Sequence, residues 1–228
     1  MTRGNISFTL LVGSSLGLAA VAHANYAFDN FTGPSLGYNV DNGWSVCGQS
    51  NAGWSGKTPG HASEQLADEF TAALGGTLTE IEVAVDRGSA PDTNSLIATL
   101  YSDSGANTLG TSLGSWTATN QMLATFSPNS IIAFGTSGTG ITLTKGAKYW
   151  VYLSAGDPGF FGSWRLENSG DTARNRLIAN GSATQYGVAD AFAFNVQVQP
   201  PAATPEPVTS ILAAVGLGLA GARRVRRR

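Results

Sequence analysis

The sequence predicts an all-β protein, an antiparallel β-sandwich of a jelly-roll-like kind, with a short helix expected at each end of the chain. Apolar and polar residues alternate in many short runs, and glycine, asparagine and aspartate recur between these runs. Only 12% of the 228 residues are charged and 29 are glycine, a composition that suits short strands joined by tight turns. We expect four parts: a signal peptide over 1–24, a β-domain over 25–199, a proline-rich linker over 200–207, and a hydrophobic helix with a basic tail over 208–228.

The first part has the organisation of a secretory signal peptide. Arg3 gives the positive start, and residues 8–21 form a short, mainly apolar stretch. Ala22-His23-Ala24 then fits the small-x-small pattern that signal peptidase recognises. We expect cleavage after Ala24, which makes Asn25 the first mature residue. The alternative is an uncleaved N-terminal anchor, for which the apolar stretch is short.

The β-domain is clearest where a strand would bury only one face. In residues 77–85 (TLTEIEVAV), the apolar side chains mark one face, and Glu80 and Glu82 point outward as a solvated surface. Residues 63–73 could form a short helix, but we expect a strand there. The predicted strands are 26–31, 65–71, 77–85, 95–101, 112–117, 131–134, 140–144, 148–154, 163–167, 176–179 and 191–198. Turn signals separate them, among them Asp-Asn-Gly at 41–43 and Asp-Pro-Gly at 157–159.

The C-terminal region has three parts in order. Pro205-Glu206-Pro207 closes an extended linker, because its prolines lack N–H donors and fix φ. The uncharged residues 208–222 follow, and as a helix they would reach roughly 22 Å, less than the ~30 Å hydrocarbon core. A basic block completes the region and would stay on the cytoplasmic side of a membrane; it consists of Arg223, Arg224, Arg226, Arg227 and Arg228. These parts alone fit either a weak permanent anchor or a transient one.

The order of these parts, TPEPVTSILAAVGLGLAGARRVRRR over 204–228, resembles the PEP-CTERM sorting signal. The resemblance implies processing near the PEP motif by an exosortase, a membrane enzyme of Gram-negative bacteria. The runs ADEFTAALGGTLTEIEVAV, NSLIATLYSDSG and KGAKYWVYLSA, within residues 31–194, resemble the choice-of-anchor domains of exported bacterial proteins, particularly type R. That second resemblance implies a β-sandwich joined to a sorting tail, and it supplies no catalytic residue.

Charge and cysteine content exclude several classes of protein. Seven lysines and arginines against fifteen acidic residues leave residues 25–207 with a net charge of −8, which argues against a nucleic-acid partner. The single cysteine, Cys47, excludes an internal disulfide and a cysteine-rich zinc site, and we expect a small buried hydrophobe there. A catalytic cysteine would need His61, fourteen positions away in a Gly/Ser-rich stretch.

The acidic residues offer a weak case for catalysis or metal binding. A glycan hydrolase would need Glu64 or Asp68 to face another carboxylate across a cleft, with a raised pKa. Calcium could be held by the oxygen-rich loops 86–94 and 103–107, but these lack EF-hand spacing, and Asx turns explain them better. Gly53-Trp54-Ser55-Gly56 is not a nucleophile elbow. We therefore expect no enzyme, no cofactor and no metal site.

The tryptophans are the best candidates for ligand binding. Trp150, within YWVYL, is expected in the core. Trp44 and Trp54 lie in a polar, glycine-rich segment and could stack on sugar rings, although partly buried loop anchors are the simpler interpretation. The sequence thus predicts an exported, non-catalytic structural or interaction protein, held transiently in the inner membrane and sorted to the cell surface or extracellular matrix. The alternatives are a module that binds extracellular polysaccharide and, third, the glycan hydrolase.

Overall fold

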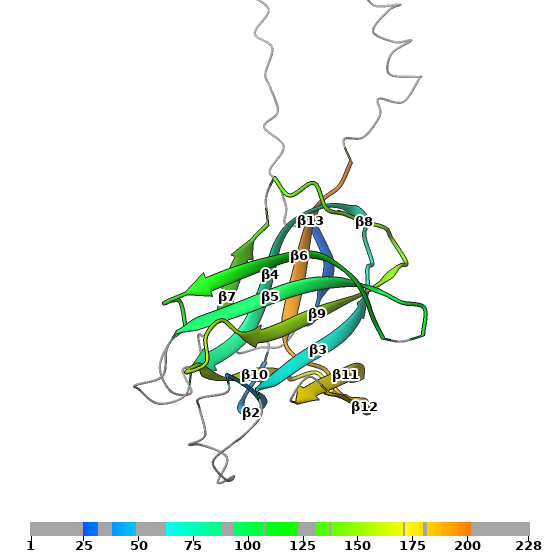
Figure 1. The fold of residues 1–228 in the computed structure, drawn as a ribbon. Coiled ribbons are helices and arrows are strands. Elements are labelled where there is room, and N and C mark those ends of the chain that lie inside the picture. Colours follow the sequence, from blue (N-terminus) through cyan, green and yellow to red (C-terminus); the bar gives the residue numbers. More distant parts are fainter. Residues whose placement is uncertain are drawn as a thin grey trace, which may run out of the picture.

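The computed structural model describes residues 25–31, 38–48, 63–87, 94–106, 108–122, 131–136, 138–170, 172–179 and 182–201. This part of the chain is all-β, and it contains thirteen strands and no helix (Figure 1). The predicted all-β class and the antiparallel pairing are confirmed. The helices expected within 1–24 and 208–228 lie outside the described residues. In the described ranges, no helix is long and apolar enough to cross a membrane.

The strands are short and follow one another closely along the chain. Their bounds are β1 Asn25–Asp29, β2 Tyr38–Cys47, β3 Glu64–Thr71, β4 Gly76–Arg87, β5 Ser95–Asp103, β6 Leu109–Thr119, β7 Ile131–Gly135, β8 Thr142–Leu143, β9 Lys148–Ala155, β10 Phe161–Glu167, β11 Thr172–Ala179, β12 Ser182–Asp190 and β13 Phe194–Gln199. Residues 65–71, where a helix was the alternative, form a strand as predicted. Two strands, β2 and β12, were not predicted.

All thirteen strands belong to one hydrogen-bonded sheet that folds back on itself. The main order is β1-β13-β4-β10-β2-β3-β9-β5-β6, with β7 and β8 paired to β4, and with β11 joining β3 to β12. The long strand β4 connects two wings, since its first part pairs with β13 and its last residues pair with β10. In Figure 1, strands β6, β5, β9 and β3 lie in front of β7, β4 and β13.

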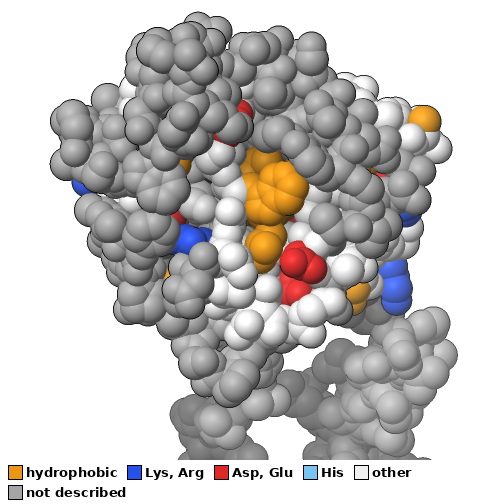
Figure 2. Space-filling view, turned by 90° about the horizontal axis from the view of Figure 1, so that it is seen from below, with side chains coloured by type: hydrophobic (Ala, Val, Ile, Leu, Met, Phe, Trp, Pro, Cys, Tyr) orange, Lys and Arg blue, Asp and Glu red, His pale blue; other side chains and the backbone are white. Residues whose placement is uncertain are grey.

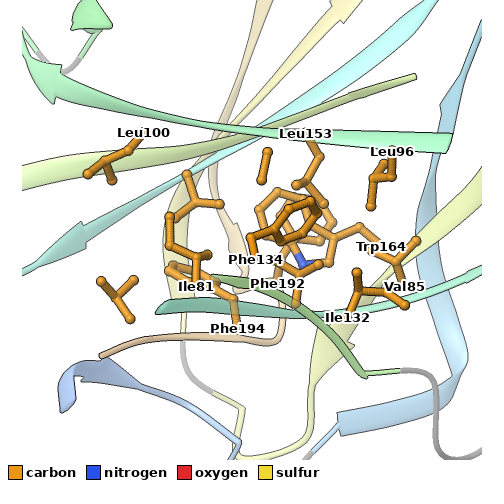
Figure 3. Close-up of a cluster of buried hydrophobic side chains, with 14 of the residues drawn as sticks. Ile81, Val85, Leu96, Leu100, Ile132, Phe134, Leu153, Trp164, Phe192 and Phe194 are labelled. Carbon is orange, nitrogen blue, oxygen red and sulfur yellow. The ribbon is translucent and has the colours of Figure 1, made fainter. Parts of the chain in front are cut away.

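The hydrophobic core fills the space between these two wings (Figure 3). Leu96 and Leu153 come from the front wing and belong to one buried cluster with Ile81, Phe134 and Phe194 from the other wing. These side chains are almost fully buried. Burying one such side chain contributes about 1.5–3 kcal/mol, so this cluster is the main source of stability.

Strand β4 shows how the sequence pattern positions its two faces. Leu78 and Ile81 are fully buried, and Glu80 and Glu82 lie on the opposite, partly exposed face. The three-residue spacing between Leu78 and Ile81 comes from a β-bulge at Thr79, because Gln197 pairs with Glu80 and Val198 pairs with Leu78. The predicted strand and the outward orientation of the two glutamates are confirmed.

The Asp-Asn-Gly run at 41–43 is not the turn that the sequence predicted; it lies inside β2. The ladder between β10 and β2 shifts register here, because Arg165 pairs with Gly43 and Glu167 pairs with Tyr38. A Cβ on Gly43 would lie 2.6 Å from the carbonyl oxygen of Trp164. Gly43 therefore allows two backbones to approach closely within a bulge. An Asn-Gly pair more often indicates a hairpin turn, which is why a turn was predicted.

Candidate functional site

The segment 190–194, between β12 and β13, is held by buried polar side chains. It was predicted as part of one strand over 191–198, but β13 begins only at Phe194, and Phe192 forms an isolated bridge with Leu166. Asn30 donates from Nδ2 to the carbonyl of Phe192 at 2.7 Å, and the N–H of Phe194 donates to Asn30 Oδ1 at 2.8 Å. One amide side chain thus satisfies two buried backbone groups that a continuous ladder would otherwise pair.

Asp68 holds the same segment from the core-facing side of β3. It lies between Leu66 and Phe70 on one strand face, and its exposed fraction is 0%. The N–H of Phe192 donates to Asp68 Oδ2 at 2.7 Å. Burial raises the pKa of this carboxyl well above its usual range, although the hydrogen bond from Phe192 works in the other direction. The other carboxyl oxygen, Oδ1, is buried without a hydrogen-bond partner.

Asn175 and Trp164 complete this junction. Asn175 is paired directly with Asp68 across β11 and β3, and its Nδ2 donates to the carbonyl of Asp190 at 2.7 Å. Trp164 donates from Nε1 to the carbonyl of Ala193 at 3.1 Å, and its ring stacks on Phe192 at 4.6 Å. The arrangement fixes how the chain crosses between two strands, and we interpret it as structural.

The acids named for hydrolysis do not face each other. Glu64 and Asp68 lie on the same face of β3, four residues apart, which corresponds to roughly 13 Å along a strand. Glu64 accepts a hydrogen bond from the hydroxyl of Ser45 and is 9% exposed. Asp68 has the raised pKa that a general acid would need, but it is enclosed among apolar side chains. A catalytic use of this pair therefore gains no support from the geometry.

Trp44 is a half-buried residue at the border of the core. It lies on β2 opposite Trp164, packs against the core cluster, and meets Phe192 edge-on with ring centroids 6.4 Å apart. Its partial burial agrees with the simpler interpretation, although Trp44 lies on a strand and not in a loop. Trp54 lies outside the described residues, so the structure does not bring the two tryptophans together, and sugar stacking on either one stays a prediction.

Cys47 and Trp150 are both buried. Cys47 is buried, as expected, and His61 lies outside the described residues. Trp150 is fully buried, as predicted, but on the side of β9 opposite its core neighbours Tyr149 and Val151.

Asp103 forms the expected Asx turn, because its Oδ2 accepts the N–H of Gly105 at 2.8 Å. Its other oxygen accepts Nε1 of Trp150 at 3.0 Å. Most of the other oxygen-rich loop, 86–94, lies outside the described residues, because 88–93 are not described. In the described ranges, no group of three or more His, Cys, Asp or Glu side chains is arranged to hold a metal ion.

The predicted sorting and cleavage residues lie outside the described residues, but their attachment points do not. These residues are Ala22, Ala24, Pro205, Glu206, Pro207, Arg223, Arg224, Arg226, Arg227 and Arg228. Strand β1 begins at Asn25, β13 ends at Gln199, and Asn25 pairs with Val198. The C-terminal end of β13 (orange) lies at the top of Figure 1. Both flanking segments therefore join the β-domain at one end. The opposite end shows hydrophobic side chains beside acidic ones (Figure 2).

Sequence reasoning missed the residues that hold the junction. Asn30 and Phe192 are 162 positions apart, so no local pattern connects them. Asp68 lies between the apolar residues Leu66 and Phe70 on one strand face, and that interruption was the available signal. Neither a scan against protein-family models nor a search of curated proteins gives a match to this chain.

Proposed function

We propose that this chain is an exported, non-catalytic structural or interaction protein that a PEP-CTERM-like tail sorts to the cell surface or extracellular matrix. The observation that carries the proposal is the order Pro205-Glu206-Pro207, uncharged stretch, arginine block, in a chain that also has a signal-peptide pattern. The implied partners are an exosortase-type processing enzyme and, transiently, the inner membrane of a Gram-negative cell.

The physical basis of sorting is a marginal helix that stops in the membrane. The uncharged residues 208–222 are short for a span, and the arginines after them resist crossing. The proline-rich linker then lies outside the membrane, where a peptidase can bind it as an extended segment. The described strands lie between Asn25 and Gln199, within the range expected for the β-domain. As a finer description of the fold, we propose that the folded-over sheet is a jelly-roll-like sandwich.

Mutation of the motif tests the proposal. In Pro205→Ala/Pro207→Ala, we expect the protein to accumulate in the inner-membrane fraction, because the extended recognition segment is lost. Pro200→Ala/Pro201→Ala is the matched control, since it removes two prolines from the same linker outside the motif, and it should reach the surface fraction as wild type does. Equal distribution of both variants would contradict sorting through the PEP motif.

The alternative function is a module that binds extracellular polysaccharide. The observation that favours it is the polar outer face of β4 and β13, where glutamate and amide side chains lie side by side. Such planar polar groups suit the hydroxyl and amine groups of sugars.

A further inference from the structure

Two rows of side chains cross the outer face of four neighbouring strands. The cross-strand pairing of β1, β13, β4 and β7 brings each row into register. We call these the acid–amide rows; they are Tyr26–Gln197–Glu80–Gly135 and Asp29–Asn195–Glu82–Ala133. Because residues opposite one another on a sheet share a face, the rows form one surface on the side away from the core.

Amide side chains organise the carboxylates in these rows. Gln197 donates from Nε2 to Glu80 Oε1 at 2.8 Å and lies 3.4 Å from Glu82 Oε2. Asn195 donates from Nδ2 to the same oxygen of Glu82. The two glutamates are thus fixed next to each other on one strand face instead of spreading into solvent.

The negative charge of the rows has no described counter-charge. Burial and the neighbouring Glu82 both raise the pKa of Glu80, as expected for two adjacent carboxylates. Burial together with Asp29, Glu82 and Glu80 raises the pKa of Tyr26. Among the described side chains, no lysine or arginine forms an ion pair with these three acids.

Asn195 adds an independent sign of a missing partner. Its side chain is 3% exposed, and its Oδ1 has no hydrogen-bond partner although its Nδ2 is bound to Glu82. An unpaired buried acceptor costs free energy, and here it lies beside carboxylates whose described donors are neutral amide groups. Among the described residues, the surface therefore has no positive charge that pairs with its acids, and the Asn195 oxygen lacks a donor.

The β7 side of the rows offers an open, small-residue floor. Gly135 and Ala133 are exposed, and a Cβ on Gly135 would meet no atom within 4 Å. Ile131, the next outward residue on β7, is 42% exposed. A flat ring could lie on this floor while its polar substituents reach Glu80 and Glu82.

We propose that the acid–amide rows bind an amine-bearing glycan, a polysaccharide whose sugar rings carry free amino groups. The ammonium groups would bind the glutamates, hydroxyl groups would bind Gln197, and ring faces would contact Tyr26 and the β7 floor. The inference deepens the interaction role proposed above. The net charge of −8 over residues 25–207 disfavours anionic polymers. A sheet face offers no free backbone for pairing with an extended peptide, which would use a strand edge.

Calorimetry with the full-length chain in a mild non-ionic detergent tests the proposal. The probe is a glucosamine hexamer at mildly acidic pH, with EDTA present so that divalent cations do not contribute. We expect binding that weakens with added salt, and binding at least tenfold weaker for the N-acetylglucosamine hexamer, which lacks the positive charges. Equal binding of the two oligosaccharides, or no binding of either, would overturn the proposal. Hexalysine binding as tightly as the glucosamine hexamer would also overturn it.

Variants locate the binding surface. Glu80→Gln/Glu82→Gln should weaken glucosamine-hexamer binding at least tenfold, since it removes the two charges and keeps the shape. Glu69→Gln/Asp190→Asn removes two acidic charges outside the rows and should stay within twofold of wild type. Equal losses in both variants would place binding elsewhere.

Should the glutamate variant fail to fold, Tyr26→Ala provides the second test, with an expected weakening of glucosamine-hexamer binding of at least threefold. The binding assay does not depend on sorting, so its failure leaves the Pro205/Pro207 result intact, and the reverse also holds.

Discussion

Replacing Asp68 by asparagine tests whether the buried carboxyl at the β12–β13 junction is structural. Asparagine keeps the shape and keeps an oxygen to accept the N–H of Phe192, which now bonds to Asp68 Oδ2 at 2.7 Å. It also supplies an NH₂ group on the side of the unpartnered Asp68 Oδ1. Asn175, the direct cross-strand partner of Asp68, has an unpartnered buried oxygen as well. We expect Asp68→Asn to be more stable than wild type at neutral pH.

The expected size of the effect follows from linkage. The folded-state pKa of Asp68 is raised, so the stability that its proton contributes is fully present below the unfolded pKa of about 3.9 and is lost as pH rises through the folded pKa. Between these two values, the free energy of unfolding of wild type should fall, relative to Asp68→Asn, by about 1.4 kcal/mol per pH unit. Asp68→Ala should instead be destabilised by about 1–3 kcal/mol or more, because it leaves the Phe192 N–H buried without an acceptor.

Urea denaturation of the full-length chain at a series of pH values measures these differences. Wild type, Asp68→Asn and Asp68→Ala are compared at each pH. A stability difference between wild type and Asp68→Asn that does not change with pH would refute the argument that the carboxyl is buried and protonated. Destabilisation of Asp68→Asn as large as that of Asp68→Ala would do the same.

Asn30, Gly43 and Tyr152 each make a described contact whose loss can be measured. Asn30→Ala should lower the free energy of unfolding by about 2–4 kcal/mol, because it leaves two buried backbone groups unpaired. Denaturant titration measures this difference, and an effect below about 0.5 kcal/mol would contradict the junction geometry. Gly43→Ala should lower the free energy of unfolding by about 1–3 kcal/mol. Gly135→Ala is the control, because a Cβ there meets nothing within 4 Å, and it should lower the free energy of unfolding by less than about 0.5 kcal/mol. Equal melting temperatures of the two variants would refute the close backbone approach at Gly43. Burial and the neighbouring Tyr101 raise the pKa of Tyr152 to about 12. The stability that the protonated Tyr152 hydroxyl contributes should therefore persist at pH 10 and be lost as pH rises through about 12. An ultraviolet titration in which every tyrosine ionises near pH 10 would contradict the raised pKa.

The sequence was most informative where one local rule decides the structure. In β4, the alternation of apolar and polar residues predicts a strand with one buried face. Glu80 and Glu82 therefore lie on the outer face, as expected. The turn predicted at Asp-Asn-Gly was wrong for a physical reason. Its glycine allows the close approach of the backbone of Trp164, a residue more than a hundred positions away. Local turn chemistry cannot distinguish a hairpin from a bulge that a distant strand imposes.

The site residues were less predictable because their partners are distant in the chain. Asp68 was considered only as a catalytic acid. Its partner Phe192 lies 124 positions away, so no local pattern indicated the contact. The outward direction of Glu80 and Glu82 was predicted, but their alignment with Asn195 and Gln197 depends on the register of β13 beside β4. Such register comes from the whole sheet and cannot be read from either strand alone.

The intact mass of the wild-type protein recovered from the cell-surface fraction tests the central claim most directly. The account predicts a chain that begins at Asn25 and ends near Pro205-Glu206-Pro207, without the arginine block. A mass that includes Arg228 would show that the tail is a permanent weak anchor, and it would contradict the proposed sorting.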